Sequence, residues 1–242
     1  RCTASKGDII FVMPGHSETA ATQITCDVAG VSIIGLGRGG NRPLITAHAS
    51  AVDCMNVTAH DVYIENLHFY GAASCTAFIN LNDADDFCAR NCWLQGIATP
   101  ANQVTVADAS RFHFDGCRFE SEADGPDTAI QIEATDQNGW TVENCVFNFH
   151  DTGLDTAALE SSFKSSGGVF RNNLCIGMVL TMVDINSSND DGEGLIVNCH
   201  GAFTGAVAPN AAIDPGGYVC SEVFASALAA AGGAHVPSTS DS

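Results

Sequence analysis

Basic residues are scarce in this chain of 242 residues. Nine Lys and Arg stand against 28 Asp and Glu, which gives a formal net charge of −19 at pH 7. A charge of this size repels phosphate backbones, anionic lipid surfaces and polyuronic acids at long range. We therefore expect no nucleic-acid partner and no membrane partner.

Long apolar runs are missing too. No stretch of about 18 apolar residues is present, so we expect no membrane-spanning segment. Residues 1–30 also lack the order of basic, apolar and small residues that marks a secretory signal peptide.

Tyr (3) and Trp (2) are few, whereas Phe (13) and Gly (24) are common and Val, Ile and Thr recur in short runs. This balance favours strands over helices. With 45% hydrophobic residues, the chain can bury one continuous core, so we expect a single, mostly β domain.

Cysteine, in contrast, is common. The chain has eleven cysteines, an odd number, and most lie inside strand-like patterns. Buried thiols in a protein made in a reducing compartment fit this pattern better than a secreted disulfide framework.

One pattern recurs six times along the chain: apolar, x, apolar, x, Asn, Cys or Leu, x, apolar. The segments are 62–69, 87–94, 112–119, 140–147, 169–176 and 194–201. The Cys or Leu position gives a reference column of Leu67, Cys92, Cys117, Cys145, Leu174 and Cys199. Its steps are about 25 residues, which is typical of one coil of a solenoid, and the column is expected to form part of the core.

A corner precedes the reference column in each segment, at Asn66, Asn91, Gly116, Asn144, Asn173 and Asn198. Asn and Gly enter the left-handed region most easily, which indicates a tight bend between two strands. A further short strand precedes each segment, for example at 77–81 and 103–106. The sequence therefore predicts an all-β, single-stranded parallel β-helix with three strands per coil.

These repeats resemble the right-handed parallel β-helix superfamily typified by pectate lyases, over roughly residues 30–205. The stretches Gly7-Asp-Ile-Ile-Phe-Val-Met-Pro-Gly-His-Ser-Glu-Thr19 and Asp27-Val-Ala-Gly-Val-Ser-Ile-Ile-Gly-Leu-Gly37 resemble, more narrowly, the opening coils of β-helix proteins encoded by tailed phages and prophages. The resemblance implies a right-handed coil and a phage-like source.

The ends depart from the repeat and give three expected regions. Residues 1–25 would form an N-terminal cap and first coil, 26–205 the β-helix, and 206–242 a flap or short helix followed by a mobile tail. The short helix is expected within 221–231, which is rich in alanine. Both ends are candidate caps or subunit contacts, because the end of a solenoid must be covered.

An oxygen-bearing column lies nine residues before the reference column, at Thr58, Asp83, Asp108, Asp136, Ser165 and Asp190. Recurrence in every coil favours a turn role, in which these side chains bond to backbone N–H groups. Two alternatives stay open. No cofactor is expected, but Ca²⁺ could bind at Asp83, Asp108, Asp136 and Asp190. Asp83, Asp108 and Asp136 are also candidate catalytic acids, since a retaining glycosidase holds two carboxyl groups about one rung apart.

Three hypotheses for function follow. The first is a non-catalytic structural or adhesive protein of a phage-like virion, such as a capsid decoration, head fibre or spike, made in the host cytoplasm and bound to other virion proteins or to itself as a homotrimer. The second is a polysaccharide lyase or glycoside hydrolase, which could be secreted. The third is a module that binds a host-surface glycan through the outward aromatic residues Trp93, Tyr63 and Tyr70.

Overall fold

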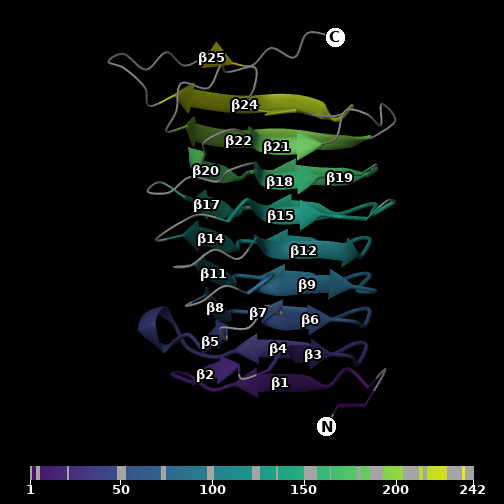
Figure 1. Cartoon of the computed structure of the whole chain (residues 1–242), viewed down its shortest axis with the longest axis vertical. Coiled ribbons are helices and arrows are strands. Elements are labelled where there is room, and N and C mark those ends of the chain that lie inside the picture. Colours follow the sequence, from purple (N-terminus) through teal and green to yellow (C-terminus); the bar gives the residue numbers. More distant parts are fainter. Residues whose placement is uncertain are drawn as a thin grey trace.

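The structure is a computed structural model. It describes residues 2–3, 6–20, 22–47, 53–71, 75–96, 101–121, 126–134, 136–149, 157–163, 165–178, 181–185, 193–203, 213–214, 217–227 and 236–237. Within them the chain winds as a right-handed stack of coils, with the N-terminal and C-terminal coils at opposite ends of a rod (Figure 1). The predicted parallel β-helix is confirmed, including its three strands per coil.

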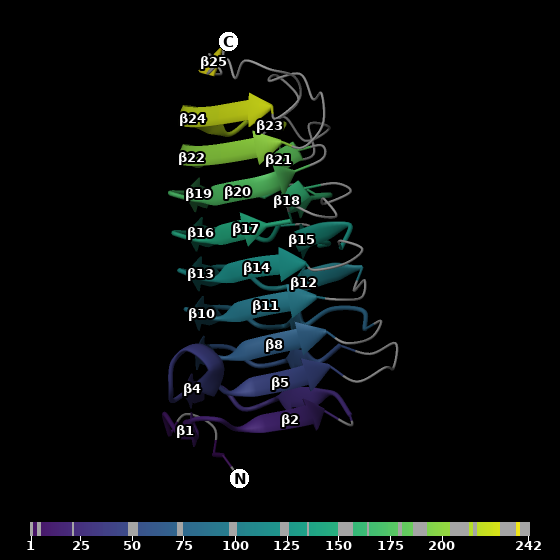
Figure 2. The same cartoon turned by 90° about the vertical axis from the view of Figure 1, so that its left-hand side faces the viewer.

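The strands form three faces, and along each face successive strands pair in parallel (Figure 2). The first face contains β1 (Ile9–Val12), β4 (Ser32–Gly35), β7 (Tyr63–Glu65), β10 (Cys88–Arg90), β13 (His113–Asp115), β16 (Thr141–Glu143) and β19 (Gly168–Arg171). The second face contains β2 (Ser17–Ala20), β5 (Leu44–Ala47), β8 (His68–Gly71), β11 (Trp93–Gly96), β14 (Arg118–Ser121), β17 (Val146–Asn148) and β20 (Leu174–Met178). The third face contains β3 (Ile24–Cys26), β6 (Met55–Val57), β9 (Ile79–Asn82), β12 (Asn102–Asp108), β15 (Thr128–Ile132), β18 (Ala157–Ser161), β21 (Thr181–Ile185) and β23 (Ile213–Asp214).

Two long strands near the C-terminal end, β22 (Gly194–Phe203) and β24 (Val219–Ala227), run through both the first and the second face. The expected short helix within 221–231 is therefore wrong for the described residues, because residues 221–227 continue the β-helix as part of β24. Alanine spacing suited a helix, but a strand bonded to β22 satisfies the same backbone groups. Strand β25 (Val236–Pro237) pairs antiparallel with β24, and a 3₁₀ turn spans Gly39–Asn41.

The corner between the first and second faces is made by residues with positive φ. These are Asn66 (56°), Asn91 (49°), Gly116 (63°), Asn144 (56°), Asn172 (56°) and Asn198 (50°). Asparagine tolerates this conformation because its short amide bonds locally. Here the amides also bond along the rod, as from Asn198 Nδ2 to Asn172 Oδ1 at 3.0 Å.

The predicted register of the fifth repeat is wrong by one residue. Asn172, not Asn173, takes the corner, and the strand register pairs Leu174 with Val146. Asn173 consequently occupies the core column beside Cys145 and is buried, whereas Leu174 is 41% exposed. The sequence has two adjacent asparagines at this point, and in the linear pattern the apolar Leu174 fits the core position better than Asn173 does.

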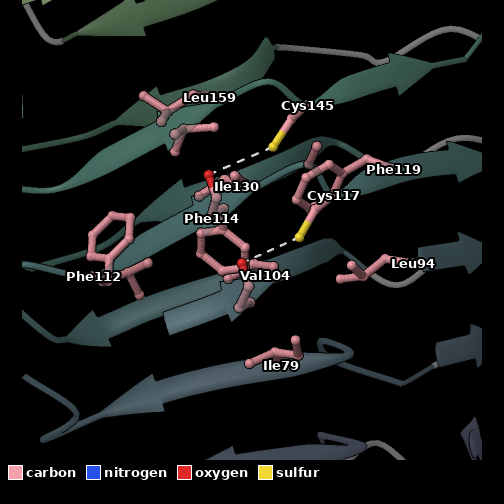
Figure 3. Close-up of a cluster of buried hydrophobic side chains, with 14 of the residues drawn as sticks. Ile79, Leu94, Val104, Phe112, Phe114, Cys117, Phe119, Ile130, Cys145 and Leu159 are labelled. Carbon is pink, nitrogen blue, oxygen red and sulfur yellow. Dashed lines mark hydrogen bonds between the residues drawn. The ribbon is translucent and has the colours of Figure 1, made fainter. Parts of the chain in front are cut away.

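The remaining members of the reference column line one interior wall. Leu67, Cys92, Cys117, Cys145 and Cys199 are all buried. Figure 3 shows Cys117 and Cys145 among Phe114, Phe119 and Ile130, and their Sγ atoms lie 3.5 and 3.7 Å from the carbonyl oxygens of Ala89 and Phe114. All eleven cysteines are free thiols.

Candidate functional site

The acids of the oxygen-bearing column lie at the turn that follows the third face. Asp83 and Asp136 have positive φ (63° and 62°), and the Asp83 side chain is exposed, 3.8 Å from His60 Nε2. Asp108 ends β12 and accepts a 3.3 Å hydrogen bond from Gln137 Nε2. Asp190 lies outside the described residues.

Two side chains that bond backbone N–H groups at this turn stand two residues further along the chain than Asp83 and Asp136. Asp85 Oδ1 accepts from Ser110 N at 2.7 Å, and Asn138 Oδ1 accepts from Ser166 N at 2.8 Å. Ser165, placed in the acid column by the shifted alignment, is buried and accepts from Trp140 Nε1 at 2.5 Å. Asp85, Ser110 and Asn138 are therefore the coil-to-coil turn ladder.

Among the described residues, no group of three or more His, Cys, Asp or Glu side chains is arranged so that it could hold a metal ion. The structure does not bring Asp83, Asp108 and Asp136 together as such a group. No helix in the described part of the chain has the length and apolar character that crossing a membrane requires.

The outward aromatic residues are packed along the rod. Trp93 stacks on His68, with ring centroids 4.1 Å apart and an angle of 7° between the planes, and the Arg118 guanidinium lies 5.3 Å from the Trp93 ring centroid. The register places His68 and Arg118 on opposite neighbours of Trp93. Both faces of the indole ring are therefore covered, and only the edge of the ring can face solvent.

The Trp93 edge is anchored to a buried carboxylate. Trp93 Nε1 donates to Glu120 Oε2 at 2.8 Å, and Asn148 Nδ2 donates to Glu120 Oε1 at 3.2 Å. Arg118 forms an ion pair with the same Glu120. Because Glu120 is buried, these donors offset the cost of removing its charge from water.

The other two predicted binding residues also contact neighbours. Tyr63 donates its hydroxyl to Glu65 Oε2 at 2.8 Å, and burial together with Glu65 raises the pKa of Tyr63 to about 12. Tyr70 meets the His68 ring edge-on, with centroids 6.0 Å apart. Tyr63 lies on the first face and Tyr70 on the second, so the three aromatic residues do not form one platform.

A charged column that the sequence analysis did not single out runs along the first face. The strand register places Glu65, Arg90, Asp115, Glu143 and Arg171 on successive coils. Arg90 Nε lies 3.2 Å from Asp115 Oδ2, and Arg171 Nε donates to Glu143 Oε2 at 2.6 Å. The signal was present in the sequence, since each member directly precedes a corner residue.

Glu143 is the centre of this column. His113 Nε2 lies 2.8 Å from Glu143 Oε1, on the side away from Arg171 in the register. The Arg171 guanidinium and the His113 ring hold the pKa of Glu143 below its usual range. Asp115 and Glu143 are paired across adjacent strands, so their backbones are about 4.8 Å apart along the rod.

The fold defines the chain as a right-handed parallel β-helix protein, of about 25 residues per coil. No protein-family model and no curated protein matches it. Among solved structures it is similar to the catalytic domain of a GH87 α-1,3-glucanase in complex with tetrasaccharides, with 12% identity and a TM-score of 0.45 over 89% of this chain and 54% of that one. It is also similar to ORF18 of Geobacillus virus E2, with 12% identity and a TM-score of 0.42 over 90% of this chain and 53% of that one. The chain thus spans about half the length of these two proteins.

Proposed function

We propose that this protein is a non-catalytic structural or adhesive component of a phage-like particle, such as a capsid decoration, head fibre or spike. The observation that carries the proposal is that polar side chains on the outer faces bond along the rod. Glu143 is held between His113 and Arg171, and Glu120 is held by Trp93, Asn148 and Arg118.

Such ladders suit a rod with a structural role. Each coil buries its apolar residues only against neighbouring coils, so the stability of the stack depends on every interface between coils. Charge-assisted bonds between coils add to those interfaces and fix the register of the strands. A catalytic group, in contrast, needs atoms left available to a substrate. The resemblance of residues 7–19 and 27–37 to phage-encoded β-helix proteins supports a virion setting.

The proposal is tested by asking whether the chain is a component of phage-like particles. Antibodies raised against the purified chain would be used on gradient-purified particles from the organism that encodes it, by immunogold electron microscopy and by mass spectrometry of the particle fractions. We expect the chain to sediment with the particles and to be labelled at one defined place on them. A chain found only in the unassembled fraction would refute the proposal.

A second candidate function is a glycoside hydrolase, and the observation that favours it is the Asp115–Glu143 pair. Retaining glycosidases hold two carboxyl groups about 5–5.5 Å apart, close to the spacing of adjacent strands. The lowered pKa of Glu143 suits a carboxylate that stays ionised, as a nucleophile must. The formal charge of −19 favours neutral over acidic glycans.

A panel of neutral and acidic polysaccharides, with and without Ca²⁺, separates the two candidates. Reducing-end release would report hydrolysis, and unsaturated products would report a lyase. We expect neither product. Release abolished by Glu143→Gln and by Asp115→Asn would establish the second candidate, with Asp83→Asn and Asp108→Asn as matched controls that test the oxygen-bearing column.

A further inference from the structure

The outward positions of the first and second faces change character along the rod. From β7 to β17 these two faces have eight strands with two outward positions each, and the only aliphatic side chain at those positions is Val146. The next two coils, at β19, β20 and β22, have eight outward positions, of which six are aliphatic. We call these six residues the side patch: Val169, Leu174, Ile176, Leu195, Val197 and Ala202.

The side patch is exposed sideways, in coils that have a neighbouring coil both before and after them. Leu174 is 41% exposed and Leu195 is 37% exposed. Leu174 pairs with Val146 on one side and with His200 on the other, and Leu195 lies between β19 and β24 (Figure 2). Their exposure is therefore a property of the side of the rod. Single exposed apolar residues are ordinary on proteins, but a contiguous group of them marks an interaction site.

Charge is nearly absent from the side patch and its surroundings. Strands β20 and β22 contain no Asp, Glu, Lys or Arg. Arg171 is the one such residue among the eight outward positions, and it already forms an ion pair with Glu143. Another surface can therefore cover the side patch without removing an unpaired charge from water.

The third face has the opposite character. Its strands contain no Lys or Arg, and their four acids are Asp108, Glu160, Asp184 and Asp214. With a formal net charge of −19, two copies of the chain repel each other, and they do so most strongly through this face. A basic partner would be attracted to the third face, whereas an equally acidic copy of the chain can approach best through the side patch.

The shape of the side patch favours more than one neighbour. It wraps round the corner that Asn172 and Asn198 form, so that half of it lies on the first face and half on the second. One partner on one face covers only one half. If copies stand side by side about an axis parallel to the rods, the first-face half of each copy can pack on the second-face half of the next. Three is the smallest number of copies in which each has two different neighbours.

From these observations we propose that the side patch is a docking surface for further copies of this chain, which pack side by side in a closed ring of three. The corner between the first and second faces points toward the axis of the ring, and the acidic third faces point away from it. The inference does not rest on the proposed function, because such a ring forms in solution without any particle.

Sedimentation velocity of the full chain over a wide concentration range tests the proposal. We expect a species of three times 25.1 kDa, and a return to one chain mass in the double variant Leu174→Lys with Leu195→Lys. Both side chains are exposed, so the variant should fold, and an unchanged circular dichroism spectrum would show it. Because lysine lowers the net negative charge, loss of the ring could not come from added repulsion between copies.

The matched control is Phe163→Lys, which changes an apolar residue of similar exposure (39%) directly after β18 on the third face. This variant should keep the mass of three chains. A ring that dissociates in Phe163→Lys, or one that survives the double variant, would show that copies meet through another surface and would overturn the proposal.

Salt gives a second readout on the unmodified chain. Raising the ionic strength from about 0.1 M to about 1 M shortens the screening length from about 10 Å to about 3 Å. Because apolar contacts hold the ring and net charge opposes it, we expect the ring to persist at lower protein concentration in high salt. Weaker association in high salt, one chain mass at every concentration, or a dimer would each overturn the proposal.

Discussion

The side-chain oxygen of Asn173, rather than a backbone carbonyl oxygen, accepts the hydrogen bond from the backbone N–H of Cys145. Asn173 Oδ1 accepts the backbone N–H of Cys145 at 2.8 Å, and its Nδ2 donates to the backbone oxygen of Val142 at 3.0 Å. The amide is buried inside the rod, within the column of thiols. A polar side chain at this core position is stabilising because both ends of its amide bond the previous coil.

Replacing Asn173 by leucine should therefore destabilise the protein, although it makes the core more apolar. A buried N–H and a buried carbonyl lose their partners, so we expect a loss of about 2–4 kcal/mol in the free energy of unfolding. Denaturant unfolding measures it. The control is Leu174→Asn at the exposed neighbour, which should change the free energy by less than about 0.5 kcal/mol. An Asn173→Leu variant as stable as the parent would contradict the assigned register.

Substitution of the corner residue Asn172 gives a second test of the register of the fifth repeat. Its φ of 56° is costly for most side chains, so Asn172→Ala should lose about 1–2 kcal/mol. Asn172→Gly should retain most of the stability, because glycine adopts positive φ without strain, as Gly116 does at the same corner. Thermal unfolding of both variants measures the difference. Equal losses for alanine and glycine would show that the amide bonds along the corner, rather than the backbone conformation, determine the cost.

The buried thiols make stability fall at alkaline pH. Burial raises the pKa of Cys26 and Cys199 to about 11 and of Cys54 to about 12, from an ordinary value of 9.0. Above pH 9 the unfolded chain loses thiol protons that the folded chain keeps, so the folded state binds more protons and the free energy of unfolding decreases as pH rises. The stabilisation is complete below pH 9 and is lost between about pH 9 and 12.

Unfolding midpoints measured from neutral to alkaline pH check this expectation. Cys54→Ala should flatten the alkaline decline, since one fewer buried thiol titrates. A stability that is level through pH 11 would mean that these thiols are not shielded in the folded protein.

The indole of Trp93 should contribute in two separable ways. Trp93→Phe keeps a ring between His68 and Arg118 but removes the N–H that Glu120 accepts, so we expect a loss of about 1–2 kcal/mol. Trp93→Ala also removes the stacked ring, and we expect about 3–5 kcal/mol. Chemical denaturation measures both losses. If the phenylalanine variant were as unstable as the alanine variant, the Glu120 bond would account for the whole effect.

Binding to glycans gives a further check on Trp93. With both ring faces covered, Trp93 has no open surface on which a sugar ring could stack, so Trp93→Phe should leave any measured glycan affinity unchanged. Isothermal titration with the polysaccharides of the enzymatic panel makes this measurement. A strong loss of binding in Trp93→Phe, with folding intact, would favour the glycan-binding hypothesis.

Sequence reasoning predicted the fold well because a solenoid repeats its constraints. Cys92, Cys117 and Cys145 occur at the same place in each pattern, and every coil must bury that place against its neighbours. The prediction failed where the pattern was locally ambiguous, at Asn172 and Asn173. There the choice between corner and core depends on which amide can reach the Cys145 backbone, and a linear pattern does not contain that distance.

The candidate sites were harder to predict. Asp83, Asp108 and Asp136 attracted attention because acids recur, yet the backbone N–H groups at that turn are bonded by Asp85 and Asn138, two positions away. The Glu143 column has no such signal in the linear pattern, because it mixes acids and bases and no single residue type recurs. In space, that mixture lets Arg90 pair with Asp115 and Arg171 pair with Glu143 on neighbouring coils.

The sequence by itself determined the coil, because the spacing of apolar residues and of Asn corners is a property of consecutive positions. Only the tertiary structure decided what the outward side chains do. Residues about 25 apart become neighbours once the coils stack, and that stacking covers the faces of Trp93 and ties Glu143 to Arg171. Whether a side chain is engaged or available depends on the coil above and the coil below, which only folding supplies.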